Sequence, residues 1–274
     1  MRAAKDQKLG LLAGAGKFPI YLSSFAREKG YQVTVVGPEG RLEPGIDKVA
    51  HKVRYYKFAR FDDFLAALKE EGITTAIMAG KIDKRWLYEP GVELDATTIA
   101  ILKSLPDQKD DTIMNRIVQV LEERGVEVLE TTELIADWLA PEGPFGEIKP
   151  DENQKRDIKF GFKIAKEIGR LDIGQTVAVL NRAVLAVEAI DGTDMTILRA
   201  GQITPGAVVV KTLKPNQSLK FDIPVVGLST MQSMVQAKAS VLAVEAGKCL
   251  VVEREEMVAL ANAQKISIVG IKLD

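Results

Sequence analysis

The chain has 274 residues, of which 46% are hydrophobic and 6% aromatic, and its 37 basic side chains nearly balance 38 acidic ones. This composition excludes a largely disordered chain, because enough apolar surface is present to form a core. The net charge of -1 gives no support to nucleic-acid binding, which draws on clustered Lys and Arg. At about 100–200 residues per domain, the length suggests two domains.

Signals for targeting and for disulfides are weak. The first apolar run, at residues 9–15, is short and interrupted by glycine, so we interpret it as a core strand and not as a signal peptide. No apolar run reaches the roughly 18 residues of a membrane span. Cys249 is the single cysteine, which fits a reducing, cytoplasmic location.

The first half alternates short apolar runs with helical patterns, which predicts parallel strands joined by crossover helices. The predicted strands are residues 9–13, 33–36, 75–79 and 126–130. The predicted helices carry Ile20, Leu22, Phe25 and Ala26, then Phe64, Leu65 and Leu68, and then span residues 112–124 and 132–140. We therefore predict an N-terminal, Rossmann-like α/β domain with an open parallel sheet over residues 1–140.

Residues 141–150 contain three prolines and two glycines and show no periodicity, so we predict a linker over residues 141–152. Beyond it we predict a C-terminal catalytic domain of mixed α/β structure over residues 153–274. Its predicted helices are residues 153–169, 234–239 and 254–263, and its predicted strands are residues 176–180, 183–189, 207–211, 241–246 and 266–269.

A glycine-rich turn follows the first predicted strand. Gly14 and Gly16 precede a predicted helix, whose free backbone N–H groups and dipole favour a phosphate. The dinucleotide fingerprint is poorly met, because Pro19 replaces its third glycine and no acidic residue follows the second strand. A purely structural turn is the alternative.

Gly80 and Lys81 follow the predicted strand at residues 75–79, at the sheet edge where open α/β sheets bind ligands. Lys81 is therefore a candidate phosphate ligand, with a solvated loop lysine as the alternative. Asp110 and Asp111 precede a predicted helix, and helix capping explains Asp111 without any function.

Carboxylates interrupt two apolar strands of the second half, where an unpaired charge is not expected. Glu188 and Glu245 each follow the same VLAV sequence, and Asp191 and Asp194 come shortly after Glu188. Such groups need cationic partners or a bound metal ion. The candidate partners are Lys211, Lys214, Arg199 or a divalent cation. Oxygen ligands without a His or Cys cluster favour Mg²⁺ over zinc, with Mn²⁺ as an option.

Lys214, Gln217 and Asp222 lie in a loop bounded by Pro215 and Pro224. Proline restricts a loop at low entropic cost, which helps to hold a catalytic carboxylate. A structural turn is the alternative. His51, the single histidine, alternates with apolar residues on a predicted strand, so catalysis by a histidine-activated nucleophile is not supported.

Several segments, spread over nearly the whole chain, together resemble one family. They are LGLLAGAGKFP, MAGKIDK, DDTIMNRIVQVLEERGVEV, GRLDIGQTVAV, VLAVEAIDGTD, VVVKTLKPNQ, KFDIPVVG and AVEAGK. In this order they resemble the LpxI-type UDP-2,3-diacylglucosamine pyrophosphatases of bacterial lipid A synthesis.

The resemblance implies two domains that hold the substrate between them and hydrolyse its pyrophosphate with magnesium. The implied products are UMP and 2,3-diacylglucosamine 1-phosphate, called lipid X, with water directed at the phosphorus nearer the sugar. Asp222 matches the aspartate of the family's basic-aromatic-Asp-hydrophobe-Pro segment, which implies an essential catalytic role. Asp191 stands where the family has Glu, and Ser218 stands where the family commonly has an acidic residue.

The residues and the resemblance together give one site hypothesis. The predicted catalytic residues are Asp222, Glu188, Asp194 and Lys214. The predicted substrate-binding residues are Gly14, Gly16, Gly80, Lys81, Thr193, Lys211 and Gln217. The predicted metal ligands are Asp191, Asp194, Asp222 and Glu245.

A lipid substrate predicts further contacts. Candidates for a groove that holds the acyl chains are Trp86, Leu87, Trp138 and Phe145, with core or linker packing as the alternative. Transient contact with the cytoplasmic face of the inner membrane is expected without an anchor, and a homodimer is an option. Two other classes stay open: a nucleotide- or dinucleotide-binding oxidoreductase and a non-catalytic, two-lobed nucleotide sensor.

Overall fold

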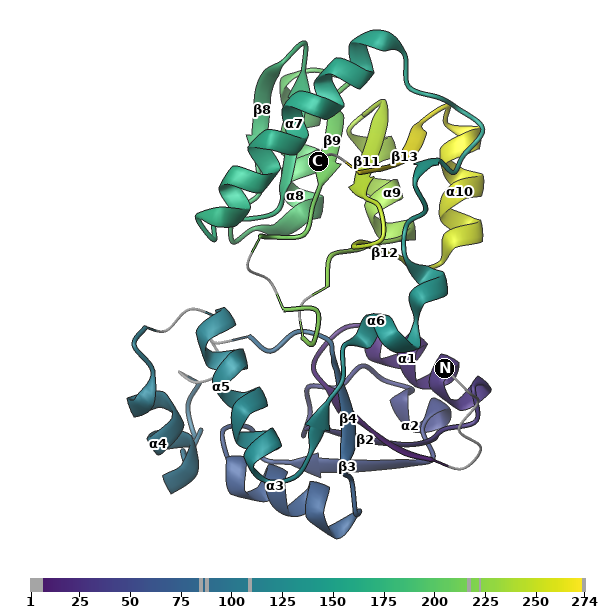
Figure 1. Cartoon of the computed structure of the whole chain (residues 1–274). Coiled ribbons are helices and arrows are strands. Elements are labelled where there is room, and N and C mark those ends of the chain that lie inside the picture. The colour runs from purple at the N-terminus through teal and green to yellow at the C-terminus, as the bar shows by residue number, and fades with distance from the viewer. Residues whose placement is uncertain are drawn as a thin grey trace. The chain divides into compact units, whose positions relative to one another are not determined.

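A computed structural model describes residues 7–83, 86, 89–107, 110–215, 218–221 and 223–272, with only the backbone of residues 110 and 111. Leu87, Gln217 and Asp222, which carry predicted roles, lie outside the described residues. The chain divides into two compact units (Figure 1). The first is Met1–Ile135 with Ser218–Asp222, and the second is Ala136–Gln217 with Ile223–Asp274. None of the described helices is both long enough and apolar enough to cross a membrane.

The first unit contains a five-stranded, fully parallel sheet with strand order β3-β2-β1-β4-β5. Its strands are β1 (Lys8–Ala13), β2 (Gln32–Pro38), β3 (Lys52–Tyr56), β4 (Thr75–Ala79) and β5 (Glu127–Val128). Its helices are α1 (Phe18–Glu28), α2 (Ile46–Val49), α3 (Phe61–Glu70), α4 (Ala96–Ser104), α5 (Asp110–Glu123) and α6 (Thr131–Leu134). This topology confirms the predicted Rossmann-like open sheet.

Several elements of this unit differ from the prediction. The strand predicted at residues 126–130 pairs only at Glu127 and Val128. The helix predicted at residues 132–140 is instead the single turn α6 followed by a 3₁₀ turn at Ala136–Trp138. Helix α4 was not predicted, although Asp95 caps it by accepting a 2.7 Å hydrogen bond from the Thr98 N–H.

The second unit contains a six-stranded mixed sheet with strand order β6-β13-β11-β9-β7-β8. Its strands are β6 (Gly143–Pro144), β7 (Thr176–Leu180), β8 (Ala183–Val187), β9 (Val208–Lys211), β11 (Val241–Glu245) and β13 (Ser267–Ile271). A separate parallel pair joins β10 (Val225–Val226) to β12 (Leu250–Val251). The helices are α7 (Glu152–Arg170), α8 (Gly192–Ile203), α9 (Leu228–Gln236) and α10 (Arg254–Ala263). The predicted mixed α/β class is therefore confirmed.

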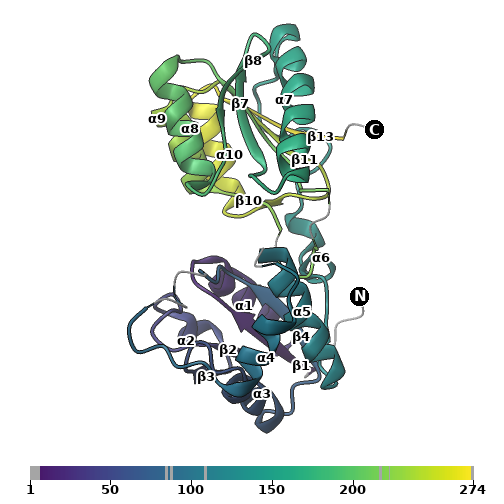
Figure 2. The same ribbon diagram turned by 90° about the vertical axis from the view of Figure 1, so that its left-hand side faces the viewer.

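Helices cover both faces of this second sheet, with α7 on one face and α8, α9 and α10 on the other (Figure 2). Strand β9 shows how the sequence builds the two layers. Val208 and Val210 pack in the cluster that contains Phe162 of α7, whereas Val209 packs in the cluster that contains Met231 of α9. Successive side chains of a strand point to opposite faces of the sheet, so β9 contributes to the core on each face, and every residue of β9 is buried.

A tight hairpin joins β7 to β8 at Asn181 and Arg182, whose φ angles are 51° and 59°. Two consecutive positive φ angles are typical of a type I′ turn, which matches the twist of paired strands. Asp157 of α7 is 3% exposed and accepts hydrogen bonds from both turn amides, at 2.8 and 2.7 Å. The helix and the hairpin are thereby fixed to each other.

Two of the predicted elements in this unit were misplaced. Helix α9 begins at Leu228 and not at the predicted residue 234, because Met231 and Met234 form its buried side. The strand predicted at residues 183–189 ends at Val187, so Glu188 follows the strand and does not interrupt it.

Candidate active site

Several strand ends of the second sheet meet at one edge. Lys211 and Glu245 are the last residues of the neighbouring parallel strands β9 and β11. Thr176, the first residue of the antiparallel strand β7, is paired with Lys211, and its carbonyl oxygen accepts a 2.9 Å hydrogen bond from the Glu188 N–H. The fold therefore gathers Lys211, Glu188 and Glu245 at the carboxyl edge of β9 and β11, where α/β sheets commonly bind ligands.

Lys211, Thr193 and Glu188 form a continuous hydrogen-bonded chain. The Lys211 Nζ donates to Thr193 Oγ1 at 2.9 Å, and this hydroxyl donates to Glu188 Oε1 at 2.9 Å. Glu188 Oε2 accepts from the Gln175 N–H at 3.1 Å. Lys211 is 6% and Glu188 8% exposed, so a buried cation and a buried carboxylate share one hydroxyl. We call Lys211, Thr193 and Glu188 the edge triad.

Glu245 is held by two lysines and one backbone amide. Its Oε2 accepts from Lys166 Nζ and, at 2.9 Å, from the Leu213 N–H, and its Oε1 lies 3.1 Å from Lys248 Nζ. Burial alone raises the pKa of Glu245, but the hydrogen bonds from Lys166, Leu213 and Lys248 outweigh it and lower the pKa below its ordinary value. Glu245 is therefore ionised and paired at neutral pH.

Asp191 and Asp194 lie at the start of α8. Asp191 Oδ2 is 3.0 Å from Arg199 Nε, and Asp191 Oδ1 accepts from the Ala189 N–H at 3.3 Å. Asp194 is exposed in the first turn of the helix. Because the N-terminal turn carries the positive end of the helix dipole, it stabilises a carboxylate at either position.

Lys214 follows β9 and pairs with Asp172 at 2.7 Å. Lys166, on α7, also donates to the Leu213 carbonyl oxygen at 2.8 Å. Three lysines therefore make contacts at or next to this sheet edge, namely Lys166, Lys211 and Lys214. The edge is rich in cationic groups as a result.

The described part of the chain contains no group of three His, Cys, Asp or Glu side chains placed to hold a metal ion. The predicted ligand Glu245 already has two lysine partners, which fits a structural ion pair better than a metal ligand. Asp222 lies outside the described residues. The predicted magnesium site therefore stays a prediction.

The glycine-rich turn of the first unit is built by a close contact between two loops. The Ala15 N–H donates to the Lys81 carbonyl oxygen and the Lys81 N–H donates to that of Ala15, each at 2.9 Å. A Cβ atom at Gly14 would lie 2.5 Å from the Lys81 oxygen, and one at Gly80 would lie 2.8 Å from the Ala15 oxygen. Both glycines are thus explained by backbone packing alone.

Gly16 differs from these two glycines. A Cβ atom at Gly16 would meet nothing within 4 Å, and its φ angle of +96°, like the +90° of Gly80, disfavours any other residue. Lys81 is exposed. The open space beside Gly16 and the exposed Lys81 are compatible with a bound ligand. The ligand-binding role of this turn stays a prediction.

The aromatic candidates for an acyl-chain groove pack against protein groups. The Trp86 ring lies edge-on to Phe58 at 5.3 Å and carries the Arg41 guanidinium at 4.8 Å. Phe145 packs on the core of the second unit. These contacts favour the packing alternative for Trp86 and Phe145.

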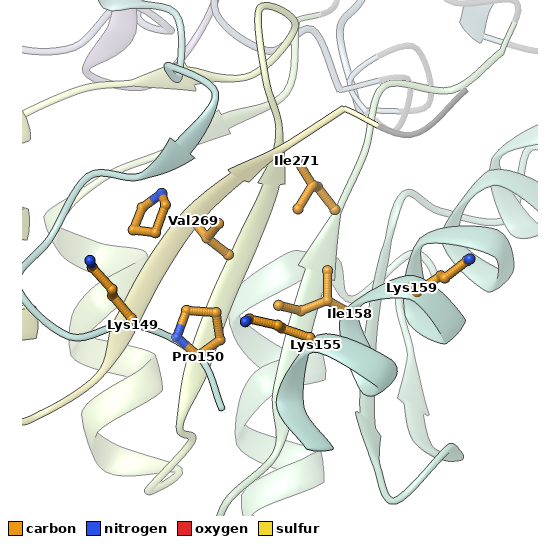
Figure 3. A pocket seen from close by; sticks show the side chains of 8 residues that line it. Lys149, Pro150, Lys155, Ile158, Lys159, Val269 and Ile271 are labelled. Atoms are coloured by element: carbon orange, nitrogen blue, oxygen red, sulfur yellow. The ribbon is translucent and has the colours of Figure 1, made fainter. Parts of the chain in front are cut away.

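A surface hollow lies beside α7 in the second unit (Figure 3). Its floor is apolar and its rim is basic, with side chains from α7, β13 and the segment before α7. The lining residues are Pro144, Lys149, Pro150, Lys155, Ile158, Lys159, Val269 and Ile271. None of the predicted site residues lines it.

Sequence reasoning missed three residues of this edge. Lys166 was missed because its partner Glu245 is 79 positions away along the chain. Gln175 Oε1 and Thr212 Oγ1 are buried without a hydrogen-bond partner among the described residues. Such atoms mark a place for a water molecule or a ligand group, which the sequence pattern did not reveal.

The described surroundings of the single histidine and the single cysteine are structural. His51 Nδ1 accepts a 3.1 Å hydrogen bond from the Val33 N–H, which ties it to β2. Burial raises the pKa of the Cys249 thiol to about 12, so this cysteine is protonated and unsuited to nucleophilic catalysis.

An open parallel sheet with a glycine-lined turn, followed by a mixed sheet with lysines and carboxylates at one edge, defines a two-domain α/β protein. The LpxI N-terminal domain model matches residues 8–138, and the LpxI C-terminal domain model matches residues 141–269. The chain therefore belongs to the LpxI family.

A relative from Caulobacter vibrioides is named UDP-2,3-diacylglucosamine pyrophosphatase LpxI. It is 29% identical over 277 aligned positions, which cover 97% of this chain and 98% of the relative. The similarity thus extends over both domains.

The solved structures that the chain resembles are more distant. N5-carboxyaminoimidazole synthetase from Staphylococcus aureus, complexed with ADP, is 17% identical over 46% of this chain and 32% of that protein, with a TM-score of 0.26. N5-carboxyaminoimidazole ribonucleotide synthetase from Thermotoga maritima is 15% identical over 68% of this chain and 42% of that protein, with a TM-score of 0.23. This chain spans less than half of either protein, and such scores do not establish a shared fold.

Proposed function

We propose that the chain hydrolyses the pyrophosphate bond of UDP-2,3-diacylglucosamine and releases UMP and 2,3-diacylglucosamine 1-phosphate. The observation that carries this proposal is family membership, because a pyrophosphatase of that name aligns over 97% of the chain. The cation-rich edge of the second sheet adds support, since a pyrophosphate needs positive groups to balance its oxygens.

At this edge, Lys211 and Lys214 are the proposed phosphate ligands. The side chain of Lys214 is 18% exposed and that of Asp172 33% exposed, so a phosphate oxygen can replace Asp172 without creating a buried unpaired charge. Lys211 is already fixed by Thr193 and by the Val225 carbonyl oxygen at 3.0 Å. A fixed cation needs little reorganisation when charge develops during the reaction.

Glu188 and Thr193 are proposed to orient the substrate through the edge triad. Thr193 Oγ1 accepts from Lys211 and donates to Glu188, so its proton has a defined direction. Gln217, which lies outside the described residues, is a further proposed substrate-binding residue. In the first unit, Gly14, Gly16, Gly80 and Lys81 are proposed to bind the nucleotide or the sugar headgroup.

Asp222 is proposed to order the attacking water, and Asp194 is a further proposed catalytic residue. A carboxylate that accepts a hydrogen bond from water raises the electron density of the oxygen that attacks phosphorus. Magnesium remains part of the proposal, with Asp191, Asp194, Asp222 and Glu245 as the predicted ligands. Its test is the loss of UMP release on chelation and the recovery of release on adding Mg²⁺ or Mn²⁺.

The direct test is UMP release by purified protein with UDP-2,3-diacylglucosamine as substrate. Asp222→Ala and Asp222→Asn are expected to lose at least 100-fold in turnover, an effect on the order of a catalytic acid–base group. Asp47→Asn is a matched control, because Asp47 is an exposed carboxylate in the first turn of α2. Near-normal turnover in both Asp222 variants, with folding confirmed by circular dichroism, would remove Asp222 from catalysis.

Transient contact with an anionic membrane surface is proposed as well, because the substrate is a lipid. Cosedimentation with phosphatidylglycerol vesicles is expected to rise when the vesicles contain the substrate lipid. Equal sedimentation with and without that lipid would contradict the proposed contact.

A further inference from the structure

The connection between β9 and β10 is divided between the two units. Residues 212–224 separate the two strands, and connections of this length are longer than most and are often functional. The flanks of this connection belong to the second unit, but Ser218–Asp222 group with the first. The described residues Ser218, Leu219, Lys220 and Phe221 therefore have their main contacts within the first unit.

Phe221 is the apolar part of this attachment. It is partly buried and packs against the core cluster of the first unit. The cluster is formed by β1, β2, β4, α3, α5 and β5, with Leu12, Val36, Met78, Phe64, Leu121 and Val128 among its members. An aromatic ring removed from water on such a surface holds its own backbone close to that surface.

Leu219 supplies a backbone contact. Its carbonyl oxygen accepts a 3.3 Å hydrogen bond from the Thr131 N–H. Thr131 is 1% exposed, and its Oγ1 donates to the Met78 carbonyl oxygen at 3.1 Å, so the donor is itself fixed to β4. Lys220 Nζ pairs with Glu122 at 2.7 Å, but both side chains are exposed enough for this pair to contribute little.

We infer that Leu219, Lys220 and Phe221 form a clasp that fastens the chain directly before Asp222 to the first unit, with Phe221 as its positioning residue. The inference rests on the proposed catalytic role of Asp222. The α-carbons of adjacent residues are only about 3.8 Å apart, so fixing Phe221 limits the positions open to the next residue. Phe221 would then govern turnover without touching the substrate.

The test compares Phe221→Ala with Phe61→Ala. Phe61 is also a partly buried phenylalanine on the same cluster, where it lies 5.2 Å from Phe64, but it lies on α3 and far along the chain from Asp222. Both variants lose a similar apolar contact. Phe221→Ala is expected to lower kcat at least tenfold with KM within about twofold, while Phe61→Ala keeps kcat within about twofold. Phe221→Leu is expected to recover most of the lost turnover.

Limited proteolysis gives a readout that is independent of catalysis. Cleavage within residues 212–224 is expected to be faster in Phe221→Ala than in Phe61→Ala, because release of the clasp frees the connection. Equal kcat values and equal cleavage rates in the two variants would overturn the clasp. If the unmodified protein releases no UMP, the proposed function fails, and the cleavage rates still decide whether the clasp exists.

Discussion

Lys211 Nζ donates a 2.9 Å hydrogen bond to Thr193 Oγ1, and both groups lie where the second sheet ends. Thr193 passes this contact on to Glu188, so one hydroxyl joins a buried ammonium group to a buried carboxylate. Neither charge has a direct ion pair with the other among the described contacts. The hydroxyl is therefore the element on which the edge triad depends.

Thr193→Val is expected to destabilise the protein. The valine has nearly the same shape but removes one hydrogen bond from each buried charge. Lys211 keeps the Val225 carbonyl oxygen as a partner. Glu188 keeps the Gln175 N–H. The free energy of unfolding is therefore expected to fall by about 1–3 kcal/mol.

Urea denaturation measures this change, and Thr193→Ser, which keeps the hydroxyl, is expected to stay near the unmodified protein. Thr204→Val is the matched control, because the Thr204 hydroxyl makes only a long, exposed contact of 3.4 Å. Equal stability of Thr193→Val and Thr204→Val would contradict a structural role for the hydroxyl.

Glu245 predicts a dependence of stability on pH. Its pKa in the folded protein lies below the ordinary value of 4.5, so the folded state holds this proton less tightly than the unfolded state does. The resulting stabilisation is complete above the unfolded pKa and is lost as the pH falls through the lower, folded pKa.

Glu245→Gln is therefore expected to lower the free energy of unfolding most at pH 6–7, with a smaller difference from the unmodified protein near pH 3. Denaturation curves at several pH values between these limits measure the change. Glu142→Gln serves as the control, because Glu142 is exposed. A Glu245→Gln effect that does not shrink as the pH falls would show that the ion pairs with Lys166 and Lys248 are not its source.

The two turns at Gly16 and Gly40 allow a matched comparison. Both glycines have positive φ angles, +96° and +70°, and a Cβ atom at either would meet nothing within 4 Å. Alanine at either position is expected to lower the free energy of unfolding by a similar amount, about 1–2 kcal/mol. If the turn binds substrate, only Gly16→Ala raises KM. Unchanged KM in both variants would leave the turn at Gly16 with a purely structural role.

The buried centres of the sheets could be predicted from the sequence, but strand position within a sheet could not. The hexapeptide VLAVEA occurs twice, at residues 184–189, which begin in β8, and at residues 241–246, which begin in β11. In β11 Val241 is fully buried, whereas in β8 Val184 is 41% exposed because that strand lies at the sheet edge. Identical local sequences thus have different burial, since neighbours distant in the sequence decide it.

The candidate site was likewise predicted only in part. The buried acids Glu188 and Glu245 were found because a carboxylate beside an apolar run needs a partner. Their partners were harder to predict: Lys166 comes from α7, and the Gln175 amide comes from a loop before β7. Helix α8 was not predicted, because its only buried side chains are Thr196, Ile197 and Ala200. So short an apolar stripe gives the sequence no clear helical period, and the segment resembles a loop.

Product analysis in ¹⁸O-labelled water tests whether this chain cleaves a phosphoanhydride in a lipid-linked nucleotide sugar. Purified protein should convert UDP-2,3-diacylglucosamine into equal amounts of UMP and 2,3-diacylglucosamine 1-phosphate. The label should appear in the lipid monophosphate, as expected when water attacks the phosphorus nearer the sugar. Intact substrate after prolonged incubation with Mg²⁺ or Mn²⁺ would exclude the proposed hydrolysis.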